Sequence, residues 1–152
     1  MKLEQAIEQY HFSSEHLKLL INLQYTHNWA ISKIKDFLSQ FDLTVQQFNV
    51  LRIIRGQRPN PTTINLLRER MLDKMSDASR VVERLRQKGL IQRQKSEVDR
   101  RSVEVKITDE GLRVLERVDS EYAFLDNLLS NISAEQARYM NEYLDQIRGD
   151  EQ

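Results

Sequence analysis

Residues 74–111 read KMSDASRVVERLRQKGLIQRQKSEVDRRSVEVKITDEG, and this stretch decides the fold. Its pattern predicts an amphipathic helix that begins near Asp73 or Ser76 and ends at Gly89, then two short strands around a charged tip, then the start of another helix. A helix followed by a β-hairpin with arginines at its tip is the layout of a winged helix-turn-helix. Such a helix fits the major groove of duplex DNA, and the hairpin fits the adjoining minor groove or backbone.

The predicted helix has two different sides when its residues are placed at 100° intervals. The apolar side, which we expect to dock on neighbouring helices, carries Met75, Ala78, Val81, Val82 and Leu85. The polar side carries Ser76, Ser79, Arg80, Glu83 and Gln87. Small hydroxyl residues allow a helix to enter a groove, and arginine can donate two hydrogen bonds to guanine or reach a phosphate.

The polar side and the start of this helix are therefore the candidate groove contacts, and we predict that they comprise Ser76, Asp77, Ser79 and Arg80. In the alternative interpretation the serines only cap the helix. Glu83 lies on the same side and would repel phosphates. We expect it either to orient Arg80 or Arg84 or to accept a hydrogen bond from a cytosine amine.

Helices are also predicted before this unit. Apolar residues at three- and four-residue steps predict one long helix over residues 14–40. Thr44 and Gln47 have the spacing of a capping box for a second helix, which Gly56 is expected to end. Residues 58–61 read RPNP and predict a loop, because proline is excluded from a helix interior.

The remaining elements complete the fold class. Thr62 or Thr63 caps a third helix after the loop, Thr108 caps a long helix whose apolar stripe extends to Leu129, and a capping box at Ser133 predicts a last helix. The fold is therefore mainly α: a winged helix-turn-helix with a three-helix core and a two- or three-stranded β-wing. The strands are expected at residues 90–95 and 102–107.

The charge distribution indicates the kind of partner. The 152-residue chain has no net charge, but residues 52–106 contain fifteen Lys and Arg against seven Asp and Glu, a net charge of +8. The rest of the chain therefore carries −8. A basic segment that coincides with the predicted winged helix favours a polyanion such as DNA as the partner. The alternative is an ordinary mixed surface with no such partner.

Several classes of function are disfavoured. The chain has no cysteine, which excludes disulfides, thiol chemistry and cysteine-based zinc sites. His11, His16 and His27 lack the spacing of a metal-ligand set, and no phosphate-binding glycine loop or serine-nucleophile motif is present. We therefore predict no enzyme activity, no metal and no cofactor. A secretory signal and a membrane-spanning stretch are also missing from the sequence, so we expect a cytoplasmic protein.

Three segments, SRVVERLRQKGLIQR, DRRSVEVKIT and DEG, resemble the matching parts of the MarR family of bacterial transcription regulators. The detailed likeness covers residues 43–112, and the helix lengths extend it to one domain over residues 1–152. The resemblance implies a DNA-binding lobe at residues 43–108 and a helical dimerisation region at 1–40 plus 109–152. It also implies a homodimer that binds a near-palindromic operator and is commonly released by a small-molecule effector. We expect a repressor, although the position of the operator in the promoter, which a protein sequence does not contain, decides between repression and activation. The apolar stripes near both ends agree with dimerisation, although they could instead close the core of a monomer.

The resemblance also assigns roles in the wing. Arg101 matches the residue that enters the minor groove, Asp99 would hold its guanidinium by a charge-assisted hydrogen bond, and Arg100 would reach a phosphate or the groove wall. Further candidates for phosphate contacts are Arg68, Arg70, Lys74, Arg84, Arg93 and Lys95, of which some are expected to form surface ion pairs instead.

An effector pocket is expected where the first long helix meets the DNA-binding lobe. Tyr25, His27, Trp29 and Phe48 could stack on an organic anion there, with Arg52 meeting its charge. The alternative is that these aromatic residues simply belong to the core. Two rival functions also remain: a winged helix that binds another protein, and a chromosome binder without sequence preference. The dependence of DNA affinity on salt and sequence separates these from an operator-specific regulator.

Overall fold

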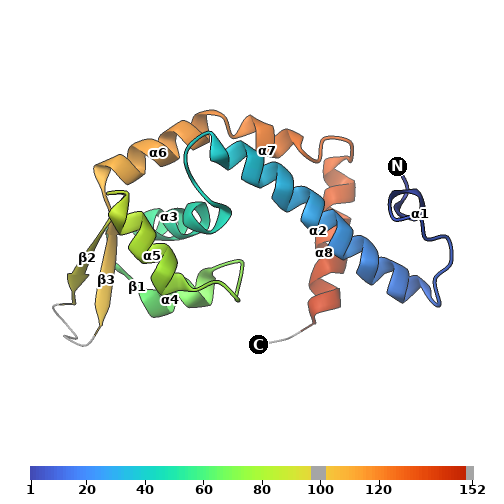
Figure 1. The fold of residues 1–152 in the computed structure, drawn as a ribbon, viewed down its shortest axis with the longest axis horizontal. Coiled ribbons are helices and arrows are strands. Elements are labelled where there is room, and N and C mark those ends of the chain that lie inside the picture. Colours follow the sequence, from blue (N-terminus) through green and yellow to red (C-terminus); the bar gives the residue numbers. More distant parts are fainter. Residues whose placement is uncertain (97–101, 150–152) are drawn as a thin grey trace. The chain divides into compact units, whose positions relative to one another are not determined.

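The computed structural model describes residues 1–96 and 102–149 and contains helices and one small antiparallel sheet (Figure 1). In chain order the elements are α1 (Leu3–Ala6), α2 (Glu15–Ser39), α3 (Val45–Gln57), β1 (Thr62–Thr63), α4 (Ile64–Arg70), α5 (Ala78–Gln87), β2 (Ile91–Lys95), β3 (Val103–Ile107), α6 (Asp109–Ser120), α7 (Ala123–Asn127) and α8 (Ala134–Arg148). The chain forms two compact units, Met1–Val118 and Asp119–Gln152. The first unit contains the predicted helix-turn-helix and its β-wing.

The core of the first unit lies between α3, α4, α5 and the sheet. Leu51 and Ile54 on α3, Leu67 on α4 and Val82 and Leu85 on α5 are almost completely buried. Helix α5 contacts α3, α4 and β2, so its apolar side is covered from three directions. Burying each such aliphatic side chain contributes about 1.5–3 kcal/mol, which holds the exposed side of α5 in a fixed orientation.

Helix α5 matches the predicted amphipathic helix, but it starts later than either expected cap. The Oδ1 atom of Asp77 accepts a hydrogen bond from the backbone N–H of Arg80 at 3.2 Å, so Asp77 is the N-cap. Gly89 follows the helix with a positive φ of 72°, as its predicted role as terminator requires. The prediction that Met75 belongs to the apolar side is wrong, because Met75 precedes the helix and is 94% exposed.

Helix α3 has the predicted start and a different end. The Thr44 hydroxyl accepts from the N–H of Gln47 at 3.1 Å, and the Gln47 side chain accepts from the N–H of Thr44 at 3.2 Å, which confirms the capping box. Gly56 does not end the helix, which continues to Gln57. The helix ends instead at the following loop, because Pro59 has no backbone N–H to donate to a helical hydrogen bond.

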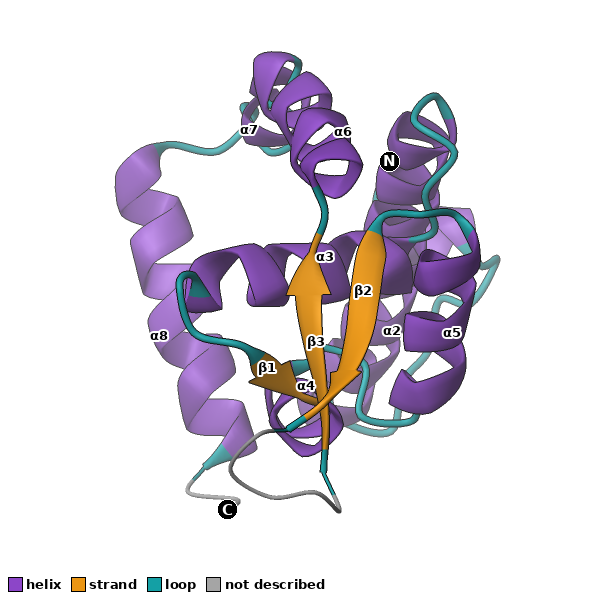
Figure 2. Cartoon of the chain, turned by 90° about the vertical axis from the view of Figure 1, so that its left-hand side faces the viewer, coloured by secondary structure: helices purple, strands orange, loops and turns teal. Residues whose placement is uncertain are grey.

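The sheet has the strand order β1-β3-β2, and both pairs are antiparallel. Strands β2 and β3 form the predicted hairpin, in which Ile91 pairs with Ile107 and Lys95 pairs with Val103. Strand β1 adds a third strand, with Thr62 opposite Val105. Figure 2 shows β2 and β3 crossing in front of α3, with α5 alongside β2.

The long helix predicted from Thr108 to Leu129 is interrupted. Helix α6 ends at Ser120 and α7 begins at Ala123, and between them Tyr122 donates its N–H to the carbonyl of Asp119, three residues back, at 3.2 Å. This tighter turn replaces the four-residue bonding of an α-helix. The apolar stripe contains no glycine or proline, so it gave no sign of the break. The capping box predicted at Ser133 is confirmed at the start of α8.

Gly111 lies where α6 passes close to the end of α5. A Cβ atom added there would lie 2.3 Å from the carbonyl oxygen of Leu90 and 2.7 Å from the side chain of Ile107. A backbone oxygen cannot move aside as a flexible side chain can. The glycine of the DEG segment is therefore required by the close approach of two backbone segments.

We predict that Gly111→Ala lowers the free energy of unfolding by about 1–3 kcal/mol, since the added methyl group forces the backbone of Leu90 away from α6. Urea denaturation, monitored by circular dichroism, measures the free energy of unfolding of each variant. Gly56→Ala is the matched control, because a Cβ there meets nothing within 4 Å and the position is helical. It should raise the free energy of unfolding by about 0.4–1 kcal/mol. Equal effects of the two substitutions would contradict the close approach.

Candidate nucleic-acid interface

The exposed side of α5 carries the residues that the sequence predicts for a DNA groove. Ser79, Arg80 and Arg84 are all exposed, whereas Ala78, Val82 and Leu85 on the opposite side are buried. Within the described residues, no hydrogen bond or ion pair holds the side chain of Arg80 or of Arg84. Two guanidinium groups one helical turn apart are thus available to an acceptor outside the chain.

Ser76 and Asp77 have roles within the protein. The Ser76 hydroxyl donates to Oδ2 of Asp73 at 2.7 Å, and the N–H of Met75 donates to Oδ1 of Asp73 at 3.0 Å. These two hydrogen bonds, the one from Ser76 above all, hold the pKa of Asp73 below its ordinary value. Asp77 caps α5. The N-cap is thus Asp77 and not a serine, so the alternative in which the serines cap this helix is wrong. Contact of Ser76 and Asp77 with DNA stays a prediction.

Glu83 binds arginines other than the two that we expected. Its carboxylate accepts from Nη2 and Nε of Arg86 at 2.8 and 3.1 Å, from Nη1 of Arg93 at 3.2 Å and from Nε2 of Gln87 at 3.3 Å. These contacts, led by the hydrogen bond from Arg86, lower the pKa of Glu83 to about 2. Arg93, a predicted phosphate contact, is thus in an ion pair.

The described part of the wing contributes Lys95, which is exposed at the end of β2. The predicted tip contacts Asp99, Arg100 and Arg101 lie outside the described residues. Their roles in the minor groove therefore stay predictions.

The other basic residues near α5 differ in how they are held. Nη1 of Arg68 lies 3.4 Å from Oδ1 of Asn65, and Nζ of Lys74 donates to the carbonyl of Glu69. Arg70 is exposed at the end of α4. Arg68 and Arg70 stay candidates for phosphate contacts.

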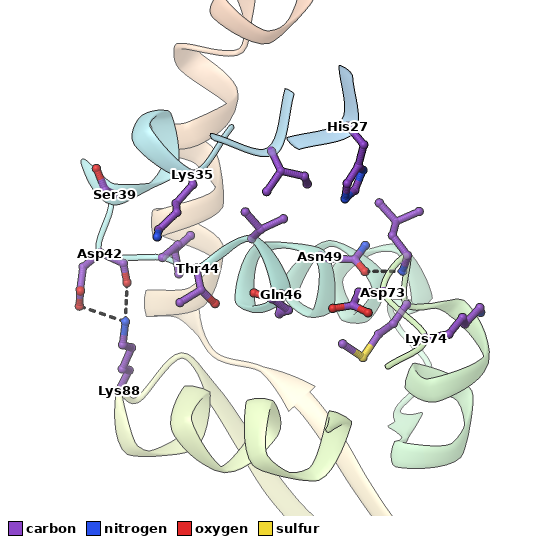
Figure 3. A pocket seen from close by; sticks show the side chains of 15 residues that line it. His27, Lys35, Ser39, Asp42, Thr44, Gln46, Asn49, Asp73, Lys74 and Lys88 are labelled. Carbon is purple, nitrogen blue, oxygen red and sulfur yellow. Dashed lines mark hydrogen bonds and ion pairs between the residues drawn. The ribbon is translucent and has the colours of Figure 1, made fainter. Parts of the chain in front are cut away.

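A groove of about 1210 Å³ lies in the first unit between α2, the start of α3 and the loop after α4 (Figure 3). Its lining combines apolar side chains with the charged side chains of Lys35, Asp42, Asp73, Lys74 and Lys88. His27 points into it from α2 and is the one member of the predicted effector set found in the lining, among the described residues.

The other four residues of the predicted effector set lie elsewhere. Tyr25 and Trp29 are exposed on α2. Phe48 is buried in the core, and the guanidinium of Arg52 lies 5.7 Å from the centre of its ring, a cation–π contact. The structure therefore does not gather the aromatic residues into one lining, and the core interpretation applies to Phe48.

Lys88 was not singled out by the sequence, although it joins α5 to the start of α3. Its Nζ lies 3.1 Å from Oδ2 of Asp42 and donates to the carbonyl of the same residue and to Oε1 of Gln47 at 3.2 Å. Asp42 and Lys88 both line the groove (Figure 3). The last turn of α5 is thus bonded to the wall of the cavity.

The described part of the chain lacks two kinds of feature. In residues 1–96 and 102–149 no group of three or more His, Asp or Glu side chains is placed to hold a metal ion. No helix in that part of the chain is both long enough and apolar enough to cross a lipid bilayer.

The chain is similar in sequence to known regulators. The sequence model of the MarR family matches residues 41–102, a range that begins four residues before α3. The HTH-type transcriptional regulator PecS of Dickeya dadantii (strain 3937) is 30% identical over 122 residues, which cover 78% of this chain and 70% of PecS.

Solved structures show the same fold. A MarR mutant of E. coli in complex with operator DNA has a TM-score of 0.79 at 23% identity, over 92% of this chain and all of that one. BpsR of Bordetella bronchiseptica, whose DNA binding is regulated by 6-hydroxynicotinic acid, has a TM-score of 0.72 at 18% identity, over 87% of this chain and 99% of that one. Because of the 30% identity to PecS and the match to the family model, this chain belongs to the MarR family, whose members are transcription regulators and not enzymes.

Proposed function

We propose that the protein is a homodimeric repressor that binds a near-palindromic operator in double-stranded DNA, in the cytoplasm, and is released by a small-molecule effector. The observation that carries DNA binding is the exposed side of α5, where Arg80 and Arg84 have no partner among the described residues. An unpaired guanidinium keeps its donors available for a guanine edge or a phosphate.

The proposed contacts follow from the position of α5. The helix enters the major groove, Arg80 donates to a base edge, and Ser79 leaves room for the close approach. Ser76 and Asp77 lie at the end of the helix that first meets the bases in helix-turn-helix proteins. Arg84 and Lys95 contact phosphates. Arg101, held by Asp99, enters the minor groove, and Arg100 contacts the backbone.

We predict that Arg80→Ala weakens binding to the best operator by about 1–3 kcal/mol and relaxes sequence preference, because a base contact is lost. The operator is first obtained by sequencing the DNA that the protein retains from a random pool. Fluorescence anisotropy with the operator and a scrambled duplex then measures both effects. Arg113→Ala on α6 is the control and should leave operator preference unchanged. Unchanged discrimination by Arg80→Ala would contradict the assignment of Arg80 to a base edge.

Dimerisation is proposed for residues 1–40 and 109–152, and the support is their uncovered apolar surface. On α2 only Phe37 and Leu38 are buried among the described residues, and none of α8 is. The large apolar side chains exposed on these two helices are Leu17, Leu19, Leu20, Tyr25, Trp29, Tyr139, Met140, Tyr143 and Ile147. Surface of this kind is typical of a face that a second copy covers. A twofold dimer would place its two α5 helices on half-sites about ten base pairs apart.

We predict that the protein sediments as a dimer and that Leu20→Asp or Tyr143→Asp shifts it toward monomer, because each would bury a charge without a partner. Analytical ultracentrifugation measures the change, and operator affinity should fall with it. Asn22→Asp adds the same charge at an exposed polar position of α2 and should remain dimeric. A wild-type protein that is monomeric at concentrations where it binds its operator would contradict this proposal.

Effector release is proposed to act through the groove beside α3. Lys35 lines this groove and has no hydrogen bond or ion pair with any residue in the described segments, so it is available to an anion. His27 lines the same groove from the same helix, and the apolar side chains Ile31 and Leu43 complete a lining suited to a ring. A small aromatic carboxylate is the ligand class that fits these groups. Tyr25, Trp29, Phe48 and Arg52, predicted for the pocket, are left outside this lining.

We predict that an aromatic carboxylate binds with a one-to-one stoichiometry per chain and lowers operator affinity, and 6-hydroxynicotinic acid is the first probe. Lys35→Gln should weaken its binding about tenfold or more, since a hydrogen bond to a charged group contributes about 1.5–3 kcal/mol. Lys33→Gln, at an exposed position of α2 outside the lining, should leave the affinity unchanged. Isothermal titration calorimetry measures both. Equal affinities for the two variants would place the ligand elsewhere.

A further inference from the structure

Glu83 is an acidic side chain in the middle of the basic, exposed side of α5. Arg80 precedes it by three residues and Arg84 follows it directly. Its side chain is 35% exposed, and the core is made by the opposite side of the helix, so packing does not require a carboxylate there. A negative charge at this place repels the phosphates of any duplex that α5 enters. On electrostatic grounds alone, a carboxylate here is expected to lower the affinity for DNA of any sequence.

Both carboxylate oxygens of Glu83 are occupied by basic partners. Arg86 binds in the two-pronged way, with Nη2 on Oε1 at 2.8 Å and Nε on Oε2 at 3.1 Å. Arg93 adds Nη1 on Oε2 at 3.2 Å, and Gln87 adds Nε2 on Oε1 at 3.3 Å. An ion pair of this geometry holds the guanidinium groups in defined positions. The same contacts lower the pKa of the Glu83 carboxyl, which is therefore ionised throughout the neutral range.

These contacts have two consequences for a DNA-binding surface. First, the ion pairs with Glu83 engage the guanidinium groups of Arg86 and Arg93. Phosphate contacts from such groups supply nearly all of the affinity for non-operator DNA. Secondly, Arg93 belongs to β2 and Glu83 to α5, so their ion pair joins the wing strand to the helix. Arg80 and Arg84 are left unpaired on the same surface among the described residues.

We propose that Glu83 is a specificity-determining residue, which suppresses binding to non-operator DNA by restraining Arg86 and Arg93 and by fixing the wing strand on α5. This role rests on the proposed function as an operator-specific DNA-binding protein. The unpaired Arg80 then distinguishes operator from non-operator DNA, while the affinity for DNA of any sequence stays low. Glu83 acts through the two arginines, so it is a positioning residue and not a base contact.

The test compares Glu83→Gln with Glu110→Gln. Both substitutions remove one negative charge and one ion pair between residues three apart, because Glu110 binds Arg113 on α6 with distances of 2.7 and 3.1 Å. The affinity for the selected operator and for a scrambled duplex is measured over a range of salt concentrations. For Glu83→Gln we expect the affinity for the scrambled duplex to rise by roughly tenfold and the operator preference to fall by a similar factor. The plot of log affinity against log salt for the scrambled duplex should steepen by about 0.9 for each arginine that reaches a phosphate.

The outcomes are distinct. A steeper salt dependence and a lower operator preference in Glu83→Gln alone would support the inference. The same operator preference in both variants would overturn it, as would a lower melting temperature of Glu83→Gln with an unchanged salt dependence, which is the mark of a purely structural ion pair. Failure of the unaltered protein to prefer any duplex would instead overturn the proposed function on which the inference rests.

Discussion

The burial of Val82 and Leu85 against α3, α4 and β2 is the interaction on which the proposed interface depends. Helix α5 has ten residues, and an isolated helix of that length is marginal in water. Its apolar side supplies the missing stability, and because every fourth or third residue is fixed in the core, the orientation of the opposite side is fixed as well. The positions of Arg80 and Arg84 are therefore a consequence of aliphatic packing on the far side of the helix, not of contacts made by the arginines themselves.

On this framework the structure separates arginines into two groups that a charge count cannot distinguish. The segment 52–106 has a net charge of +8, yet Arg86 and Arg93 are bound to Glu83, whereas Arg80 and Arg84 are unpaired in the described part of the chain. Exposed ion pairs contribute little to stability. Their effect here is on geometry and on the field around α5. The net charge accordingly indicates that a polyanion is favoured as partner. The ion pairs indicate which arginine side chains are available to bind it.

Local signals in the sequence predicted local structure. The capping boxes at Thr44 and Ser133 need only residues three apart, and the terminator Gly89 needs only its own φ, so all three were predicted correctly. The predictions that failed concern side chains whose partners are distant in the sequence or could be any of several residues. Several acceptors precede α5, and the sequence does not say that Asp73 is engaged by Ser76 while Asp77 caps the helix. The partners of Glu83 depend on where β2 lies, and the groove lining depends on how α2 packs on α3, so neither the Arg93 ion pair nor the separation of the predicted aromatic set could be derived from spacing.

Thr108, at the base of the wing, joins three segments through its hydroxyl group and its backbone N–H. Oγ1 of Thr108 donates to the carbonyl of Gly89 at 2.7 Å and accepts from the N–H of Gly111 at 3.1 Å, and the N–H of Thr108 donates to the carbonyl of Leu90 at 3.1 Å. The exit of α5, the root of the hairpin and the first turn of α6 thus meet at a single residue, with no linker that could absorb a rotation. Because these hydrogen bonds tie the three segments together, a tilt of the first turn of α6 would be expected to move the hairpin and the end of α5 with it.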